Sequence, residues 1–126
     1  MGILQTRDLP YNIGKQESYI YERDAVSYSA LADDTQTVTR DFICTGIYFW
    51  SSCGENIDPS NARMDVTING QIISGCRVEA QAGESAAEST FCVLPEWIIK
   101  QGQTIVFNET QSFGAAGASV VGYLLP

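Results

Sequence analysis

The sequence contains no histidine, and this absence removes the most common general base and the most common metal ligand of proteins. A serine or cysteine nucleophile is then left without its usual activating partner. The sequence also lacks a G-x-S-x-G motif, a phosphate-binding glycine loop and a dinucleotide fingerprint. These absences predict a protein that is not an enzyme and that uses no cofactor.

Basic residues are scarce: seven stand against 15 acidic ones, which gives a net charge of −8. A nucleic-acid-binding protein needs a basic stripe that displaces counterions from phosphates, and an anionic membrane surface attracts the same feature. No run of apolar residues approaches the roughly 18 that a membrane span requires. The sequence therefore predicts neither a nucleic-acid partner nor a membrane partner.

Metal-ligand patterns are missing as well. None of the cysteines forms a C-x-x-C pair, so we expect no metal site and favour buried free thiols, with one or two disulfides as the alternative. The acidic pairs Asp33-Asp34 and Glu84 with Glu88 lie in polar segments, where carboxylates stay solvated rather than catalytic. The four cysteines are Cys44, Cys53, Cys76 and Cys92.

What the sequence does contain is strand-forming residues in short runs. Residues 35–52 are rich in Thr, Val, Ile and aromatics, and Gly46 marks a predicted bulge or bend. Apolar and polar residues alternate over 64–68, and Asn69-Gly70 then supplies the turn of a hairpin with 71–80. The last strand is expected to dock in a sheet and to end almost at the carboxyl terminus.

Further along the chain, residues 53–62 and 81–90 are expected to be loops, the second with a possible helical turn at Glu84–Glu88. Phe91–Leu94 is expected to be a short strand that Pro95 ends. About seven or eight strands with no helical period predict an all-β, antiparallel β-sandwich of the jelly-roll kind.

The first 24 residues differ from the rest and are predicted to form an extended N-terminal arm, followed by the sandwich domain at 25–126. Tyrosine in such an arm favours contact with a partner, because the ring contributes area while the hydroxyl stays hydrated. Among Tyr48, Phe49 and Trp50, neighbours on a strand must point to opposite faces, so at least one is presented outward. The predicted partner contacts are Pro10, Tyr11, Tyr19, Tyr21, Tyr48 and Trp50.

Two stretches resemble a recurrent pattern in small virion proteins of tailed bacteriophages. The first runs from LPEWII at 94–99 through the turn KQGQT at 100–104 and the strand IVF at 105–107 to VVGYL at 120–124. The second is the strand DFICTGIYFWSS at 41–52. The chain is similar to the capsid decoration, or cement, proteins that stabilise phage heads.

This resemblance implies a non-enzymatic virion protein, made in the host cytoplasm and carried on the capsid exterior, that clamps neighbouring major capsid protein subunits as a homotrimer. It also implies that Trp97 is structural and Glu96 an ordinary solvated residue. The alternative is a carbohydrate- or receptor-binding β-sandwich of a phage tail or another virion appendage, with exposed aromatic rings that stack on sugars.

Overall fold

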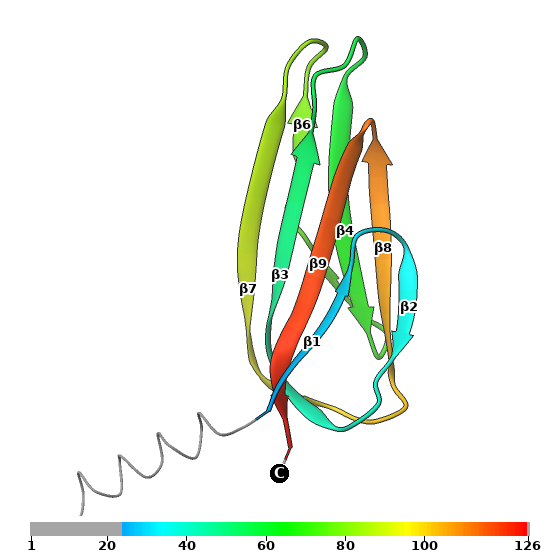
Figure 1. Cartoon of the computed structure of the whole chain (residues 1–126), viewed down its shortest axis with the longest axis vertical. Coiled ribbons are helices and arrows are strands. Elements are labelled where there is room, and N and C mark those ends of the chain that lie inside the picture. Colours follow the sequence, from blue (N-terminus) through cyan, green and yellow to red (C-terminus); the bar gives the residue numbers. More distant parts are fainter. Residues whose placement is uncertain (1–23, 126) are drawn as a thin grey trace, which may run out of the picture.

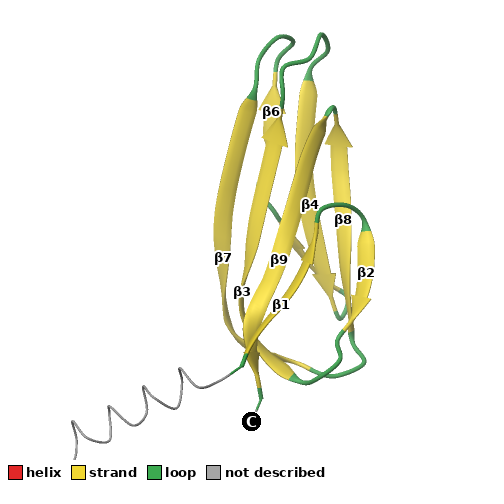
Figure 2. Cartoon of the chain, viewed as in Figure 1, coloured by secondary structure: helices red, strands yellow, loops and turns green. Residues whose placement is uncertain are grey.

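The computed structural model describes residues 24–125, and this part of the chain consists of strands joined by short loops (Figure 2). The strands are β1 (Ala25–Ala30), β2 (Asp34–Thr37), β3 (Phe42–Cys53), β4 (Ser60–Ile68), β5 (Gln71–Ser74), β6 (Val78–Ala80), β7 (Ala86–Ile99), β8 (Thr104–Ser112) and β9 (Gly114–Leu124).

The strands form two antiparallel sheets that pack face to face (Figure 1). One sheet has the order β1-β9-β3-β7 and the other the order β2-β8-β4-β5, with β6 also paired to β4. Because the chain crosses repeatedly from one sheet to the other, this is the double Greek key of a jelly roll. The predicted fold class is confirmed, while residues 1–23 of the predicted arm lie outside the described residues.

The core lies between the sheets and follows from the period-two alternation of the strands. Met64, Val66 and Ile68 of β4 are fully buried, whereas their neighbours Arg63 and Asp65 point outward. The sheet that contains β3 contributes the other half of the core. Its largest fully buried side chains are Phe42, Ile47, Phe49, Ile99 and Val120.

The hairpin predicted at Asn69-Gly70 is confirmed. Asn69 has φ 51° and Gly70 has φ 80°, and Ile68 pairs with Gln71 across the turn. Positive φ at both central residues is the conformation that a two-residue type I′ hairpin turn requires. The return segment is not one strand, because β5 and β6 are separated by a bend at which the Gly75 amide donates to the carbonyl of Met64.

Pro95 does not end a strand, and the prediction that it does is wrong. β7 continues through it to Ile99. The pairing of β3 with β7 shifts between Cys44 and Gly46, which places Pro95 in an irregular stretch of a strand at the end of its sheet. Proline is tolerated at such positions because its missing N–H is not needed by a neighbouring strand. The bulge or bend predicted at Gly46 is confirmed as a bulge-like shift of register at this position.

The loop predicted at 81–90 is also too long. β7 begins at Ala86, and residues 86–90 pair with Cys53 to Phe49 of β3. No helical turn forms at Glu84–Glu88. Small and polar residues make this part of the strand look like a loop in the sequence. It forms a strand because the backbone groups of the long β3 need hydrogen-bonding partners, which residues 86–90 provide.

The two ends of the described chain meet at one end of the sandwich (Figure 1). The Leu124 amide donates to the carbonyl of Asp24 at 2.9 Å. β9 lies between β1 and β3, so the last strand is docked in the sheet as predicted. Asp24, the first described residue, therefore lies beside the end of β9.

Candidate functional site

The candidate site is the outer side of the sheet β1-β9-β3-β7. The pairing of residues between strands shows which residues belong to it. Residues that face each other across paired strands point to the same side of a sheet. Tyr48 lies opposite Phe91 on β7 and Ser119 on β9, while Ile43 lies opposite Ile98 and Tyr123. We call this surface the neutral face. Its large residues are Ile43, Tyr48, Trp50, Phe91, Val93, Ile98, Val121 and Tyr123.

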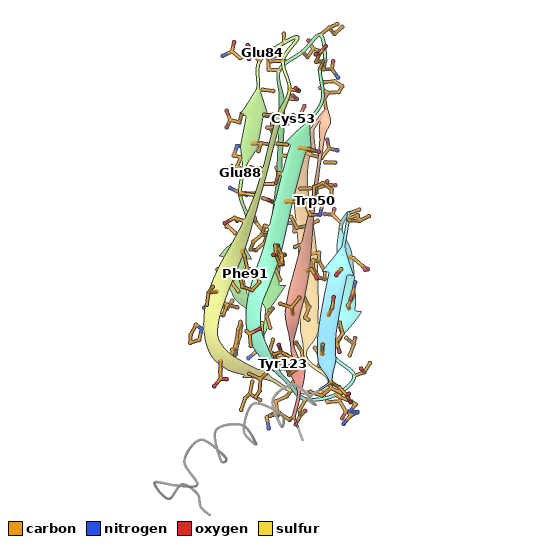
Figure 3. The ribbon with its side chains drawn as sticks, turned by 60° about the vertical axis from the view of Figure 1, so that its left-hand side comes forward. Trp50, Cys53, Glu84, Glu88, Phe91 and Tyr123 are labelled. Atoms are coloured by element: carbon orange, nitrogen blue, oxygen red, sulfur yellow. The ribbon has the colours of Figure 1, made fainter. Side chains whose placement is uncertain are left out.

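No residue in the paired rows of the neutral face carries a charge. The remaining positions are occupied by small neutral residues, mainly serine, alanine and glycine. Val93 is 74% exposed and Tyr48 is 56% exposed. Figure 3 shows three of the large side chains, Phe91, Trp50 and Tyr123, coming from β7, β3 and β9. The result is an uncharged surface over four strands, with its large apolar side chains on β3, β7 and β9.

Aromatic rings at the centre of the neutral face are held in place by glycines. The rings of Tyr48 and Phe91 lie 4.8 Å apart between centroids and are tilted by 51°. Phe91 lies against Gly46, where a Cβ atom would overlap the ring. Trp50 lies in the same way over Gly117, where a Cβ atom would come within 2.5 Å of the indole Nε1. The glycines let both rings lie close to the sheet.

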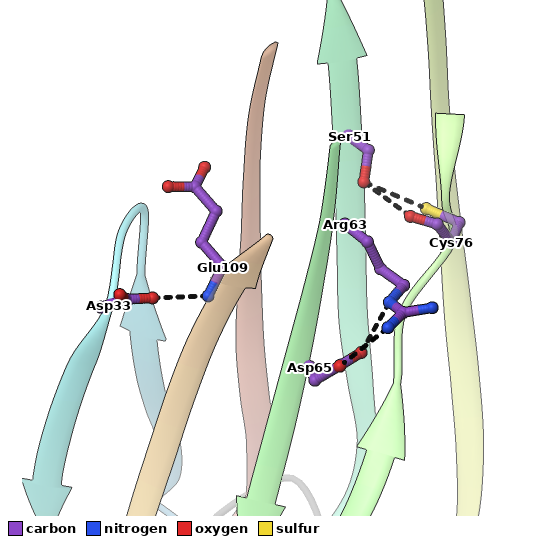
Figure 4. Close-up of polar contacts among 6 residues, drawn as sticks. All are labelled: Asp33, Ser51, Arg63, Asp65, Cys76 and Glu109. Carbon is purple, nitrogen blue, oxygen red and sulfur yellow. Dashed lines mark hydrogen bonds and ion pairs between the residues drawn. The ribbon is translucent and has the colours of Figure 1, made fainter. Parts of the chain in front are cut away.

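The outer side of the sheet β2-β8-β4-β5 has a different composition, and we call it the polar face. Thr67 lies opposite Ile72 and Val106, and Asp65 lies opposite Asn108. Arg63 forms an ion pair with Asp65, with Nε 3.1 Å from Oδ1 (Figure 4). Both surfaces therefore belong to one sandwich, but charged residues appear on the polar face only.

The charge of the molecule lies away from the neutral face. Three of the 15 acidic and three of the seven basic residues fall in 1–23, so residues 24–125 keep 12 acidic and four basic residues and the whole net charge of −8. Several of these carboxylates, including Glu55, Asp58 and Glu84, lie in the loops between β3 and β4 and between β6 and β7. An acidic molecule thus carries one extended uncharged surface.

The structure places two of the predicted contact residues, Tyr48 and Trp50, on the neutral face. The other four, Pro10, Tyr11, Tyr19 and Tyr21, lie outside the described residues.

Sequence reasoning missed Phe91, Val93, Ile98, Val121 and Tyr123 as partners of Tyr48 and Trp50. The alternation of Phe91 and Val93 was a usable signal. The expected strand end at Pro95 concealed it, and the strand pairing that brings β7 and β9 beside β3 cannot be read locally.

Trp97 lies on the opposite side of β7. It pairs with Cys44, which is buried, and its side chain is partly buried against the core. Together with Ile73 and Leu94 it lines a groove of about 280 Å³ between β5 and β7, and Glu96 lies exposed at the same groove. Trp97 thus has a packing role, as the resemblance implies.

One buried and one exposed polar side chain make structural hydrogen bonds within the fold. Ser51 donates to the carbonyl of Cys76 at 2.7 Å, and Asp33 accepts the amide of Glu109 at 2.6 Å (Figure 4). The four cysteines are free thiols, and burial raises the pKa of the Cys44 thiol above its ordinary value. A thiol that keeps its proton is a poor nucleophile.

Two further searches are confined to residues 24–125. Within this range no group of three or more Cys, Asp or Glu residues is placed to hold a metal ion. The same range contains no helix of the length and apolarity needed to cross a membrane.

Comparisons with known proteins give weak similarities only. A scan against protein-family models found no match, and a search of curated proteins found none either. Among solved structures, the chain is similar to one in the structure of infectious bursal disease virus, Gx strain, with 13% identity and a TM-score of 0.34 over 81% of this chain. It spans 31% of the length of that viral chain.

A second similar structure is the globular domain of zebrafish complement 1qA, with 17% identity and a TM-score of 0.34. That match covers 83% of this chain and 98% of the zebrafish domain. Similarities of this strength carry no argument about function. The class that the strand order itself defines is a jelly-roll β-sandwich, and the neutral face is the surface on which a functional argument can be built.

Proposed function

We propose that this chain is a non-enzymatic structural protein of a phage virion, which decorates and stabilises the outer surface of the capsid by clamping neighbouring major capsid protein subunits. The observation that supports this most is the neutral face. Soluble monomers rarely expose a continuous apolar surface of several hundred Å², and such a surface marks a contact with another macromolecule. A decoration protein needs contact surfaces of this kind and needs no reactive centre.

The proposed contact with the capsid is made by the first 24 residues, in particular Pro10, Tyr11, Tyr19 and Tyr21. The described chain begins at Asp24, which lies beside the end of β9 at one end of the sandwich. Repetition on a symmetric shell turns a modest contact per copy into strong overall binding.

The test is co-sedimentation of the purified chain with particles from which it has been stripped. We expect the full chain to bind, and we expect Tyr11→Ser, Tyr19→Ser and Tyr21→Ser combined to lose binding while thermal unfolding is unchanged. Mass spectrometry of intact particles should find the chain in a fixed ratio to the major capsid protein. Its absence from purified particles would contradict the proposal.

The alternative function is a carbohydrate- or receptor-binding module of a phage tail or other appendage. The observation that favours it is the position of Trp50, whose ring lies against Gly117 near the exposed Tyr48. Aromatic rings in this position are suited to stacking on a pyranose. A glycan array separates the two proposals, because only the alternative predicts a signal that Trp50→Ala abolishes.

A further inference from the structure

We propose that the neutral face binds the neutral face of a second copy of this chain, so that two sandwiches pair about a two-fold axis with their β1-β9-β3-β7 sheets packed together. This inference concerns self-association alone. It stands whether or not the protein resides on a capsid.

The first argument is the hydrophobic pattern of two neighbouring strands of the contact, β3 and the edge strand β7. β3 reads FICTGIYFW from Phe42 to Trp50, and β7 reads FCVLPEWII from Phe91 to Ile99. Strands covered on one side alternate, whereas strands covered on both sides are apolar at nearly every position. Within residues 24–125, only the inner side of these strands is covered. The sequence is therefore that of a sheet with a second layer on its outside.

The second argument is charge. Residues 24–125 carry a net charge of −8, so a basic partner would be attracted to the loops and edges where the carboxylates lie. The neutral face offers such a partner no carboxylate to pair with. A second copy, in contrast, can approach this surface without burying a charge, and burying an unpaired charge costs several kcal/mol.

The third argument is area. Strands lie ~4.8 Å apart and rise ~3.3 Å per residue, so about nine residues in each of β3, β7 and β9 and the six residues of β1 cover roughly 500 Å² on each copy. The pair would bury ~1,000 Å² in total, which is about the smallest area of a specific protein interface. Two sheets packed in this way make the same arrangement that already forms the core of each copy.

The symmetry follows from the number of apolar surfaces. A three-fold ring needs the neutral face of one copy to meet a different, complementary surface on the next. The other exposed apolar side chains are separated from one another and lie in three different loops and on β5. They are Leu31, Ile57, Phe113 and Ile72. Among residues 24–125 only the neutral face is large enough to meet a second copy, so we infer a two-fold pair in place of the homotrimer that the resemblance implies.

The test is sedimentation equilibrium of the full chain and of two matched variants. Val93→Glu puts a charge on the neutral face, and Ile72→Glu puts the same charge on the polar face, where residue 72 is 66% exposed against 74% for residue 93. We expect the wild type to be a dimer. We expect Val93→Glu to weaken dimerisation roughly 100-fold, because like charges opposed in an interface cost several kcal/mol. Ile72→Glu should leave dimerisation unchanged.

Two further measurements keep the test sharp. Val93→Lys should also weaken the dimer, although it lowers the net negative charge. The new positive charge would be buried in the interface together with the like charge of the second copy. Raising the salt from about 0.05 M to about 0.5 M should strengthen wild-type association by screening the repulsion of two acidic bodies. All variants should keep the wild-type circular dichroism spectrum, since Val93 and Ile72 are both exposed.

Three outcomes would overturn the inference: a monomer at all concentrations, a stable trimer, or a dimer that Val93→Glu and Ile72→Glu affect equally. Each is independent of the capsid proposal. A dimer that never binds particles would remove the proposed function and keep the inference, whereas a monomer that binds particles would do the reverse.

Discussion

The two outer faces of this sandwich have the same architecture and opposite chemistry. The polar face alternates strictly, with Arg63, Asp65 and Thr67 outward and Met64, Val66 and Ile68 inward on β4. The neutral face carries tyrosine, tryptophan, valine and isoleucine where the polar face carries threonine and charge. Both compositions suit a strand, because β-branched and aromatic residues fit a pleated surface. The difference is that the polar face favours contact with water, whereas the neutral face favours contact with another protein surface.

The comparison shows which outward residues are needed for folding and which are not. Threonine would satisfy strand propensity at position 93 as it does at position 67, and it would keep the outer side hydrated. Valine at 93 and phenylalanine at 91 add no core packing, since they point away from the core. Their presence is explained by a contact outside the domain.

The largest expected effect comes from Gly46→Ala, which places a methyl group where the Phe91 ring of the neutral face packs. The new methyl group would overlap the Phe91 ring and lie 2.8 Å from the carbonyl oxygen of Cys92. We expect a loss of about 1–3 kcal/mol in the free energy of unfolding, as for other overpacked sites. Gly54→Ala is the control, because nothing lies within 4 Å of a methyl group there. Urea unfolding should separate the two, and equal stability would show that Phe91 moves freely.

Tyr48→Ala is expected to have the next largest effect. It removes an aromatic pair with Phe91, and such pairs contribute about 0.5–1.5 kcal/mol beyond the area that they bury. Thr67→Ala, at an outward position of the polar face, should change stability by less than about 0.5 kcal/mol. If thermal unfolding gave the same shift for both, the Tyr48–Phe91 pair would have no energetic role.

Arg63→Ala should have a small effect at neutral pH. The Arg63–Asp65 ion pair lies on the outer side of β4, with Arg63 about a third exposed. Ion pairs of this kind contribute about 0.2–1 kcal/mol and weaken in salt. We expect the difference from the wild type to shrink in high salt, as measured by urea unfolding. A loss larger than that of Gly46→Ala would contradict the ranking of the two faces.

Cys44→Ala tests the inner side of β3, beneath the neutral face, and its distinctive effect should appear only in alkali. Burial raises the pKa of this thiol in the folded state above its ordinary 9.0. As the pH rises past 9, the unfolded chain loses the proton first, so the wild type should lose stability there. Cys44→Ala should show a flatter decline above pH 9 in thermal unfolding. Parallel declines for the two proteins would rule out this thiol as the cause.

Local signals in the sequence predict much of the fold. The Asn69-Gly70 hairpin, the bend at Gly46 and the inward set of β4 each follow from a few neighbouring residues. Pro95 could not be read correctly, because whether proline ends a strand depends on its position in the sheet. That position is set by the shifted pairing of β3 with β7.

The candidate site is harder to predict than the fold, because it is assembled from three strands distant in sequence. Tyr48 and Trp50 could be selected as contacts because neighbours on a strand point to opposite sides. Their neighbours Phe91 and Tyr123 come from segments 43 and 75 residues further along the chain than Tyr48, and only strand pairing unites them. The absence of charge across the whole face is likewise visible only once the register is known.

Hydroxyl-radical footprinting at increasing protein concentration tests most directly whether the neutral face is a contact surface. The oxidation rates of Tyr48, Phe91 and Val93 should fall together as copies associate. The rates of Ile72 and Val106 on the polar face should stay constant over the same range. Oxidation of both faces at rates that do not change with concentration would contradict the account.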